Sequence, residues 1–161
     1  NDPWAAQEAS YGFVWSHPMR HLDGWDKECS FDQHAKHTGH GGAWPVDVEL
    51  LECRSCISKR NTPYLQMTVQ DADFRKELVN VWEEDMKAFE DILKAGNVMR
   101  LVMSPPTNGF RTYTLENRPG GPKWKRQRQN PGMAEYDYRV QLVGEMKDAK
   151  ELALLSMTGS V

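Results

Sequence analysis

The stretch that decides the predicted fold is residues 46–56, which read Val-Asp-Val-Glu-Leu-Leu-Glu-Cys-Arg-Ser-Cys. Over residues 46–50 apolar and charged residues alternate, and this period of two predicts a half-buried β-strand. The strand runs directly into the Cys-x-x-Cys spacing of Cys53 and Cys56, which resembles a zinc knuckle, where a tight turn aims two thiolates at one point. We therefore predict a strand that leads into a metal-binding turn.

All five histidines and all three cysteines of the chain lie between residues 17 and 56. Structural zinc sites hold four ligands in a tetrahedron, usually thiolates and imidazoles. Cys29 is the only thiol besides the Cys-x-x-Cys pair, so a histidine would be the fourth ligand. His40 ranks first among the histidines, because the glycines around it let the backbone turn its side chain inward. The predicted ligands of one structural Zn2+ are Cys29, His40, Cys53 and Cys56, with His34 and then His37 as replacements for His40.

Three other interpretations of this cluster stay open. The thiols and imidazoles could be unligated, or they could hold an iron–sulfur cluster with mixed ligands. A catalytic zinc would need an open coordination position and a nearby general base. Four carboxylates lie close to Cys29 in the sequence, but no His-Glu-x-x-His pattern or deaminase-type pattern places them. These candidate bases are Asp23, Asp26, Glu28 and Asp32.

Beyond the cluster, residues 71–95 carry apolar side chains at spacings of three and four, which predicts one long amphipathic helix. Asp71 would cap its start and Gly96 would end it. Its opposite face is acidic, which is typical of a solvated helix face. The apolar face would consist of Phe74, Leu78, Val81, Trp82, Met86, Phe89, Ile92 and Leu93.

Three strand-like segments follow the predicted helix. Residues 98–103 and 110–115 flank a turn rich in Pro and Asn-Gly and could form a hairpin, and residues 136–142 alternate as a third strand. Residues 147–157 predict a closing helix. The expected fold is α+β, with a zinc-stabilised irregular N-terminal segment, one long amphipathic helix and a small antiparallel sheet. We divide the chain into an arm (1–16), a zinc-binding segment (17–60) and a helix with a small sheet (61–161).

A basic loop rich in glycine and proline is predicted at residues 117–133. No acidic residue interrupts its basic part, which could lie on the acidic surface of a protein partner, on lipid or on RNA. The net charge of -3 argues against wholesale nucleic-acid binding, so a protein partner is favoured. Any nucleic-acid contact would run through Arg118, Lys123, Trp124, Lys125, Arg126 and Arg128.

The order Cys, His, Cys-x-x-Cys also resembles that of the small zinc-carrying accessory subunit of mitochondrial respiratory complex I. The resemblance covers about 28 residues, from Cys29 to Cys56, and implies the same four zinc ligands. In that family the spacings differ and the motif closes the chain, whereas here residues 57–161 follow it. Zinc ribbons of phage tail-assembly proteins are similar over a comparable stretch. We assign the chain to neither family.

The expected function is that of a non-catalytic, zinc-stabilised accessory subunit of a larger protein assembly, such as a respiratory-chain complex. The alternatives are a zinc-dependent enzyme and a nucleic-acid-binding zinc protein. An odd number of cysteines with a Cys-x-x-Cys suits a reducing compartment better than a disulfide framework. We therefore expect an intracellular location. The first residue is Asn1, so the chain could be a fragment or could have lost a secretory signal or an organellar transit peptide, and the last case would make the location mitochondrial.

Overall fold

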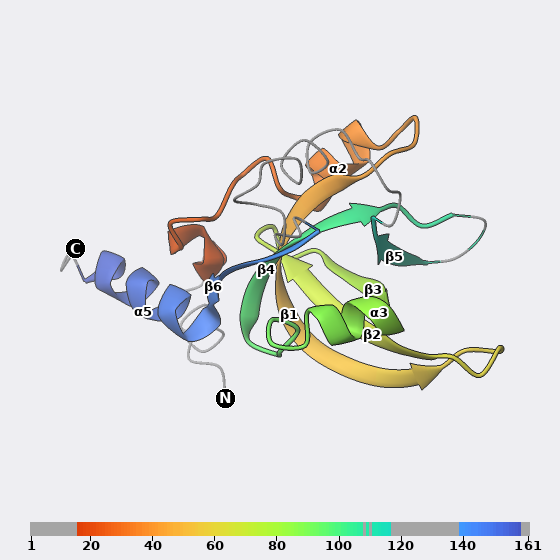
Figure 1. Cartoon of the computed structure of the whole chain (residues 1–161). Helices are drawn as coiled ribbons and strands as arrows, with labels where there is room; N and C mark the ends of the chain where they lie inside the picture. Colours follow the sequence, from red (N-terminus) through yellow and green to blue (C-terminus); the bar gives the residue numbers. More distant parts are fainter. Residues whose placement is uncertain (1–15, 108, 110, 117–138, 159–161) are drawn as a thin grey trace, which may run out of the picture.

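The computed structural model describes residues 16–107, 109, 111–116 and 139–158 (Figure 1). Two short N-terminal helices precede six strands, a helix lies between the third and fourth strands, and another helix closes the chain. In order these are η1 (Pro18–His21), α2 (Phe31–His37), β1 (Trp44–Ile57), β2 (Pro63–Asp71), β3 (Lys76–Trp82), α3 (Glu83–Ala88), β4 (Asn97–Ser104), β5 (Thr112–Leu115), β6 (Val140–Glu145) and α5 (Met146–Met157).

The first five strands close into a barrel. β1, β2 and β3 form an antiparallel meander, and β4 returns to pair with the other edge of β1. β5 then joins β3 in parallel and β4 in antiparallel orientation, which completes the ring. A meander whose fourth strand lies beside the first is a Greek key. This order, with its parallel closure between β3 and β5, is that of the OB-fold, a five-stranded Greek-key barrel.

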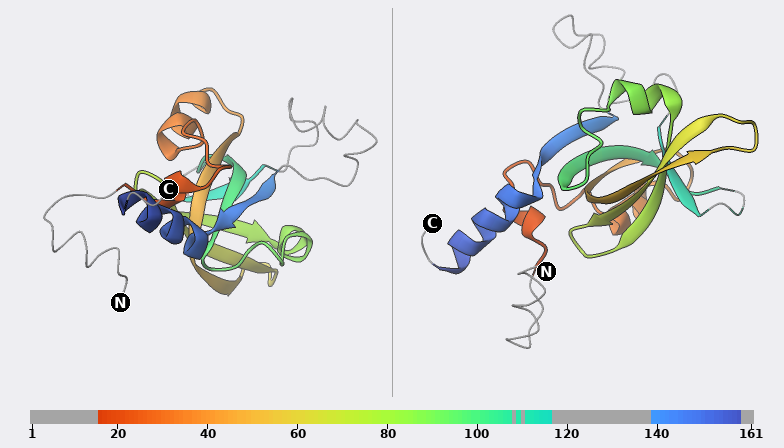
Figure 2. Two further views of the ribbon diagram at one scale, coloured as in Figure 1. Left: turned by 90° about the vertical axis from the view of Figure 1, so that its left-hand side faces the viewer. Right: turned by 90° about the horizontal axis from the view of Figure 1, so that it is seen from below.

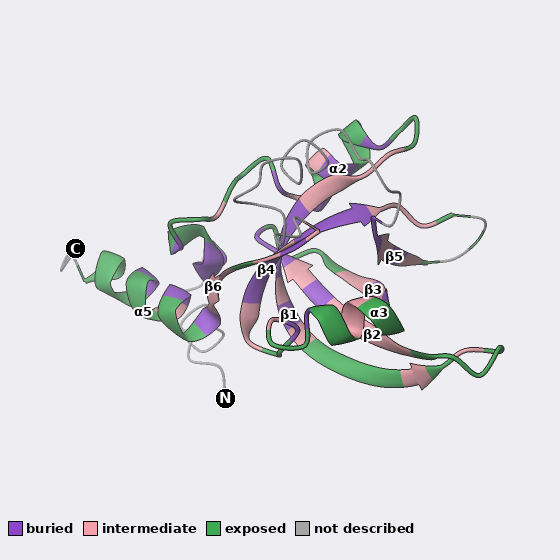
Figure 3. Cartoon of the chain, in the orientation of Figure 1, coloured by how far each residue is buried: buried purple, intermediate pink, exposed green. Residues whose placement is uncertain are grey.

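β1 is long because it pairs with two different strands, β4 along its first part and β2 along its second part. Residues 44–49 pair with β4, while residues 48–57 pair with β2. The register with β2 shifts between Leu50 and Glu52, and such a bulge bends a strand and increases its twist. Beyond the bend, β1 and β2 continue as an arm that is exposed on β1, as Figure 3 shows. The predicted strand at 46–50 is therefore confirmed, and it extends through the Cys-x-x-Cys.

Alternating side chains from every strand of the barrel fill its interior. Each buried aliphatic side chain contributes roughly 1.5–3 kcal/mol relative to exposure. The core includes Val46, Val48 and Leu50 of β1, Met67 and Val69 of β2, Val79 and Val81 of β3, Met99, Leu101 and Met103 of β4, and Tyr113 and Leu115 of β5.

The predicted helix over 71–95 is wrong, and the structure is mostly β with only short helices. Asp71 ends β2, residues 72–75 turn, and β3 follows, so that only residues 83–88 are helical in this region. Phe74 lies in this turn with a φ of 65°, which is in the left-handed region. Tertiary pairing of β3 with β2 and β5 therefore overrides a helix-like spacing.

The N-terminal segment is ordered by packing and hydrogen bonds, which corrects the expectation of a zinc-ordered segment. Phe31 of α2 is fully buried in the barrel core, and its backbone N–H donates to the Asp71 carboxylate at 3.0 Å. A second buried carboxylate, Asp47 of β1, accepts the Asp26 N–H at 3.0 Å and two hydrogen bonds from Arg100. These contacts fasten residues 17–37 across one end of the barrel.

The remaining predicted elements agree with the structure. β4 and β5 pair in antiparallel orientation as expected for the hairpin, and α5 matches the predicted closing helix. β6 overlaps the third predicted strand from Val140, whereas residues 136–138, the N-terminal arm through residue 15 and the basic loop at 117–133 lie outside the described residues. α5 packs against η1 and projects from the barrel (Figure 2). Within the described ranges no helix has the length and apolar character needed to cross a membrane.

Candidate functional site

One exposed face of the barrel, formed by β1, β2, β3 and β5, gathers polar and aromatic side chains. These residues alternate with the core residues along each strand, so they point away from the barrel interior. We call this surface the outer face. It consists of Glu52, Arg54 and Cys56 of β1, Tyr64, Gln66, Thr68 and Gln70 of β2, Lys76, Leu78, Asn80 and Trp82 of β3, and Thr112 and Thr114 of β5.

Two aromatic rings lie at one end of the outer face. Tyr64 and Trp82 are directly opposite each other on β2 and β3, with ring centroids 5.1 Å apart and planes inclined by 49°. Trp82 is 43% exposed, and Ile57 at the end of β1 is 69% exposed. A side-chain hydrogen bond with Cys56 raises the pKa of the Tyr64 phenol, so this ring is uncharged at neutral pH. The pair thus offers a neutral aromatic platform to solvent.

A chain of hydrogen bonds crosses four strands beside the aromatic pair. Arg54 Nη2 donates to Gln66 Oε1 at 2.7 Å, and Gln66 Nε2 donates to Asn80 Oδ1 at 3.3 Å. Asn80 Nδ2 donates in turn to Thr112 Oγ1 at 3.2 Å. Each link fixes the orientation of the next amide, because the donors and acceptors all run in one direction. We call these four residues the polar ladder.

The charge around the outer face is mostly positive, although the chain as a whole has a net charge of -3. The β1–β2 loop is a tight turn in which Asn61 adopts a φ of 62° and the Ser58 hydroxyl accepts the Arg60 and Thr62 N–H groups. This turn presents two basic side chains beside the arm. The exposed basic residues on or beside the outer face are Arg54, Lys59, Arg60, Lys76 and Arg111.

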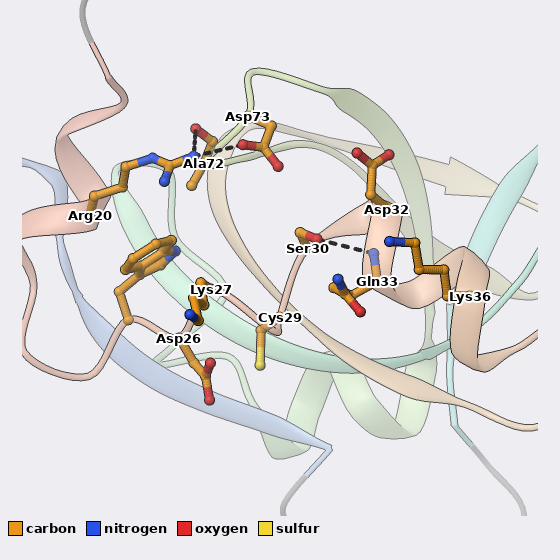
Figure 4. Close-up of a pocket in the computed structure, with 11 residues that line it drawn as sticks. Arg20, Asp26, Lys27, Cys29, Ser30, Asp32, Gln33, Lys36, Ala72 and Asp73 are labelled. Atoms are coloured by element: carbon orange, nitrogen blue, oxygen red, sulfur yellow. Dashed lines mark hydrogen bonds and ion pairs between the residues drawn. The ribbon is translucent and has the colours of Figure 1, made fainter.

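A separate pocket of about 250 Å3 lies between η1, α2 and the β2–β3 turn (Figure 4). Arg20 closes one side: its Nη2 lies 2.6 Å from Asp73 Oδ1, and its guanidinium lies over the Trp25 ring. The lining carries both signs of charge: Lys27 and Lys36 line it together with Asp26 and Asp32. A lining with both positive and negative side chains does not indicate one class of ligand.

The structure does not bring the four predicted zinc ligands together. Cys53 and Cys56 lie three residues apart in a continuous strand, so their side chains point to opposite faces of β1. Cys29 is buried in the wall of the pocket, where desolvation, followed by the charge of Asp47, raises its pKa to about 12. His40 is exposed in the connection between α2 and β1.

The two replacement ligands have other partners. His34 is buried, and its Nε2 donates to the Met103 carbonyl at 2.7 Å; burial lowers its pKa, so the imidazole is neutral at pH 7. His37 stacks on Trp44 with ring centroids 3.5 Å apart. In the described part of the chain, no group of three or more His, Cys, Asp or Glu side chains is arranged to hold a metal ion. Zinc binding by this chain stays a prediction.

Two of the candidate catalytic bases, Asp26 and Asp32, have partners within the protein. Asp26 Oδ1 accepts the Glu28 N–H at 2.9 Å, and the exposed Asp32 of α2 has its Oδ1 3.7 Å from Arg75 Nη1. The outer face, in contrast, was not predicted as a site. The sequence feature that could have indicated it is the alternation of Tyr64, Gln66 and Thr68 with more buried residues. The helix predicted over residues 71–95 left no neighbouring strand with which this segment could form a face.

Comparison with known proteins assigns no relationship: no protein-family model, curated protein or solved structure matches the chain.

Proposed function

We propose that this protein is a non-catalytic module that binds single-stranded nucleic acid on its outer face. The observation that carries the proposal is the exposed Trp82 ring, in contact with the half-buried Tyr64, beside the polar ladder on β1, β2 and β3. Barrels of this topology bind oligonucleotides or oligosaccharides with the face of strands 2 and 3 and the loops beside it. This part of the argument is an analogy between folds, and the side chains must supply the rest.

The side chains of the outer face suit single-stranded nucleic acid. Unpaired bases stack on exposed aromatic rings, and basic side chains along the path attract the phosphate backbone. Trp82 supplies the ring, while Lys59, Arg60 and Arg111 supply charge from the two adjoining loops. The acidic residues Glu83 and Glu84 follow Trp82 directly, so the favoured path ends at the start of α3.

The Trp82→Ala variant is expected to bind a fluorescein-labelled dT12 oligonucleotide at least tenfold more weakly than the wild type. Stacking on one aromatic side chain contributes roughly 1–3 kcal/mol per base, and about 1.4 kcal/mol corresponds to tenfold. Fluorescence anisotropy at constant salt measures the affinity. Leu142→Ala is the matched control, because Leu142 is 53% exposed on β6, outside the outer face.

Three results would contradict this function. The wild type could fail to bind dT12 at low salt, Trp82→Ala and Leu142→Ala could bind equally well, or a panel of neutral oligosaccharides could bind in preference to dT12. Circular dichroism of each variant separates loss of binding from loss of fold. Binding should also weaken as salt rises, because basic side chains displace counterions from the phosphates.

A specific observation also supports the accessory-subunit function as a second candidate. α5 exposes four large apolar side chains on its C-terminal half, each 37–40% accessible. Leu152 and Leu155 are three residues apart and so lie on one side of the helix. Adjoining exposed apolar side chains are typical of a protein-binding surface. We propose that α5 contacts another subunit; the assembly and its mitochondrial location stay predictions. The exposed residues are Leu152, Leu154, Leu155 and Met157.

The Leu155→Lys variant tests this second candidate. Both wild type and variant serve as bait in affinity capture from the native source. The variant is expected to recover at least tenfold less of the partner subunit than the wild type, because it places a charge in an apolar contact. Leu142→Lys on β6 is the control and should retain the partner. Equal recovery with both variants would contradict a role for α5.

A further inference from the structure

The polar ladder gives the outer face the means to distinguish one base from another, an inference that rests on the proposed function. Arg54 carries five N–H donors, and one of them is engaged with Gln66 Oε1 at 2.7 Å. This contact holds the guanidinium in place at the surface of β1, where Arg54 is exposed. Among the described residues its other guanidinium donors make no further hydrogen bond, so they are available to a ligand on the outer face.

The register of the strands places this guanidinium next to the aromatic platform. Arg54 pairs with Gln66, and two residues further along, Cys56 pairs with Tyr64, which in turn pairs with Trp82. Two residues of a strand span roughly 7 Å. Neighbouring strands lie roughly 4.8 Å apart, so Trp82 on β3 lies two strand spacings from Arg54 on β1. A purine stacked on Trp82 beside Tyr64 would lie within reach of the long Arg54 side chain.

The chemistry of Arg54 then selects the base. A guanidinium fork donates two parallel hydrogen bonds and accepts none, so it matches a base edge with two adjacent acceptors. Guanine offers O6 and N7 in this arrangement, whereas adenine places a donor beside N7. Guanine also has the larger ring system for stacking on Trp82.

We propose that the outer face prefers guanine at the nucleotide that stacks on Trp82 beside Tyr64, with Arg54 donating to O6 and N7. Gln66 and Asn80 act as positioning residues. Their amides are oriented by the ladder from Arg54 to Thr112, so they hold the guanidinium without themselves deciding the base.

The test uses the full chain and four labelled oligonucleotides: dT12, and dT12 with two central nucleotides replaced by guanine, by cytosine or by 7-deazaguanine. A bidentate contact of this kind is expected to favour the guanine probe over dT12 by about tenfold. The 7-deazaguanine probe lacks the N7 acceptor and should lose most of this preference. Cytosine, which has adjacent N3 and O2 acceptors on a smaller ring, should rank below guanine.

Arg54→Lys keeps the positive charge but lacks the fork. It should weaken binding of the guanine probe more than binding of dT12, so that the guanine probe binds no better than dT12. Arg60→Lys in the β1–β2 loop is the matched control and should keep the preference. Equal binding of all probes by the wild type, a cytosine probe as good as guanine, or a preference that survives in Arg54→Lys would overturn the inference while leaving the proposed function in place. Absence of binding to every probe would instead reject the proposed function itself.

Discussion

Replacing Asp71 with alanine is expected to lower the free energy of unfolding by about 3–5 kcal/mol. Asp71 is 1% exposed, and its carboxylate accepts three backbone hydrogen bonds. Oδ1 accepts from the N–H groups of Asp73 and Arg75 in the β2–β3 turn, and Oδ2 accepts from Phe31 at the start of α2. Alanine would leave all three donors without this partner, and each such loss costs roughly 1–3 kcal/mol when the donor is buried.

Urea unfolding measures this effect as a lower midpoint at an unchanged slope. Asp73→Ala is the control, because the Asp73 carboxylate is half exposed and pairs with Arg20 at the surface. An exposed pair of this kind contributes roughly 0–1 kcal/mol. If the two alanine variants unfolded at the same urea concentration, Asp71 would not hold the turn and α2 together as we infer.

The Arg100→Ala variant is expected to lose about 3 kcal/mol of stability at neutral pH, because it leaves the Asp47 carboxylate buried without its counter-charge. The side chain of Asp47 is fully buried, and Arg100 binds it in a bidentate manner at 2.7 and 2.9 Å. The hydrogen bond with Asp47 also raises the pKa of Arg100, so the guanidinium is charged throughout the accessible pH range.

Acid should partly rescue this variant. Burial raises the pKa of Asp47 above its ordinary value even in the presence of Arg100, and removing the guanidinium removes the largest influence that lowers this pKa. The folded variant would then bind a proton at a pH at which the unfolded chain, with its ordinary carboxyl, does not. Stability rises as pH falls wherever the folded state binds more protons.

Denaturant unfolding at several pH values tests this directly. The difference in stability between wild type and Arg100→Ala should narrow as the pH falls from about 7 towards about 5. Lys87→Ala, which removes an exposed i,i+4 pair with Glu83, should cost under about 0.5 kcal/mol at every pH. A difference that stays constant with pH would show that the loss comes from packing of Arg100 rather than from the charge on Asp47.

The strands that carry clear alternation could be predicted from the sequence. Residues 46–50 alternate with the period of a strand, the apolar run at 98–103 has the length of a typical strand, and the leucines of residues 147–157 indicate a helix. These signals are local, and local signals predict single elements. They do not predict that β1 bends at Leu50 to pair with two strands at once.

The long helix failed because its apolar spacing also fits a strand followed by other elements. Leu78, Val81 and Trp82 fit the helical spacing, but in the strand Val81 points into the barrel while Leu78 and Trp82 lie on the outer face. Only the partners on β2 and β5, far away in the sequence, decide between the two. With this segment assigned as a helix, the outer face could not be found.

Clustering in the sequence likewise did not mean clustering in space. Several of the cysteines and histidines between residues 17 and 56 have separate structural partners. His17 accepts the Met19 N–H on Nδ1 and contacts Glu49 through Nε2, Cys29 fills a buried wall, and His34 donates to β4. Nothing in their spacing distinguishes these uses from metal ligation.

The ring of strands also constrains how the chain acquires its structure. β1 pairs with β4 across about 50 residues, and β3 meets β5 only after the whole of β4 has been made. Contacts between residues so far apart in the sequence require the chain to lose loop-closure entropy before the favourable strand pairing forms. This entropy loss lowers the folding rate. During synthesis, a chain that ends before Asn97 would hold a three-stranded meander with two open edges. We therefore expect the barrel to form late and in a single cooperative step, with the outer face complete only when Thr112 joins β3.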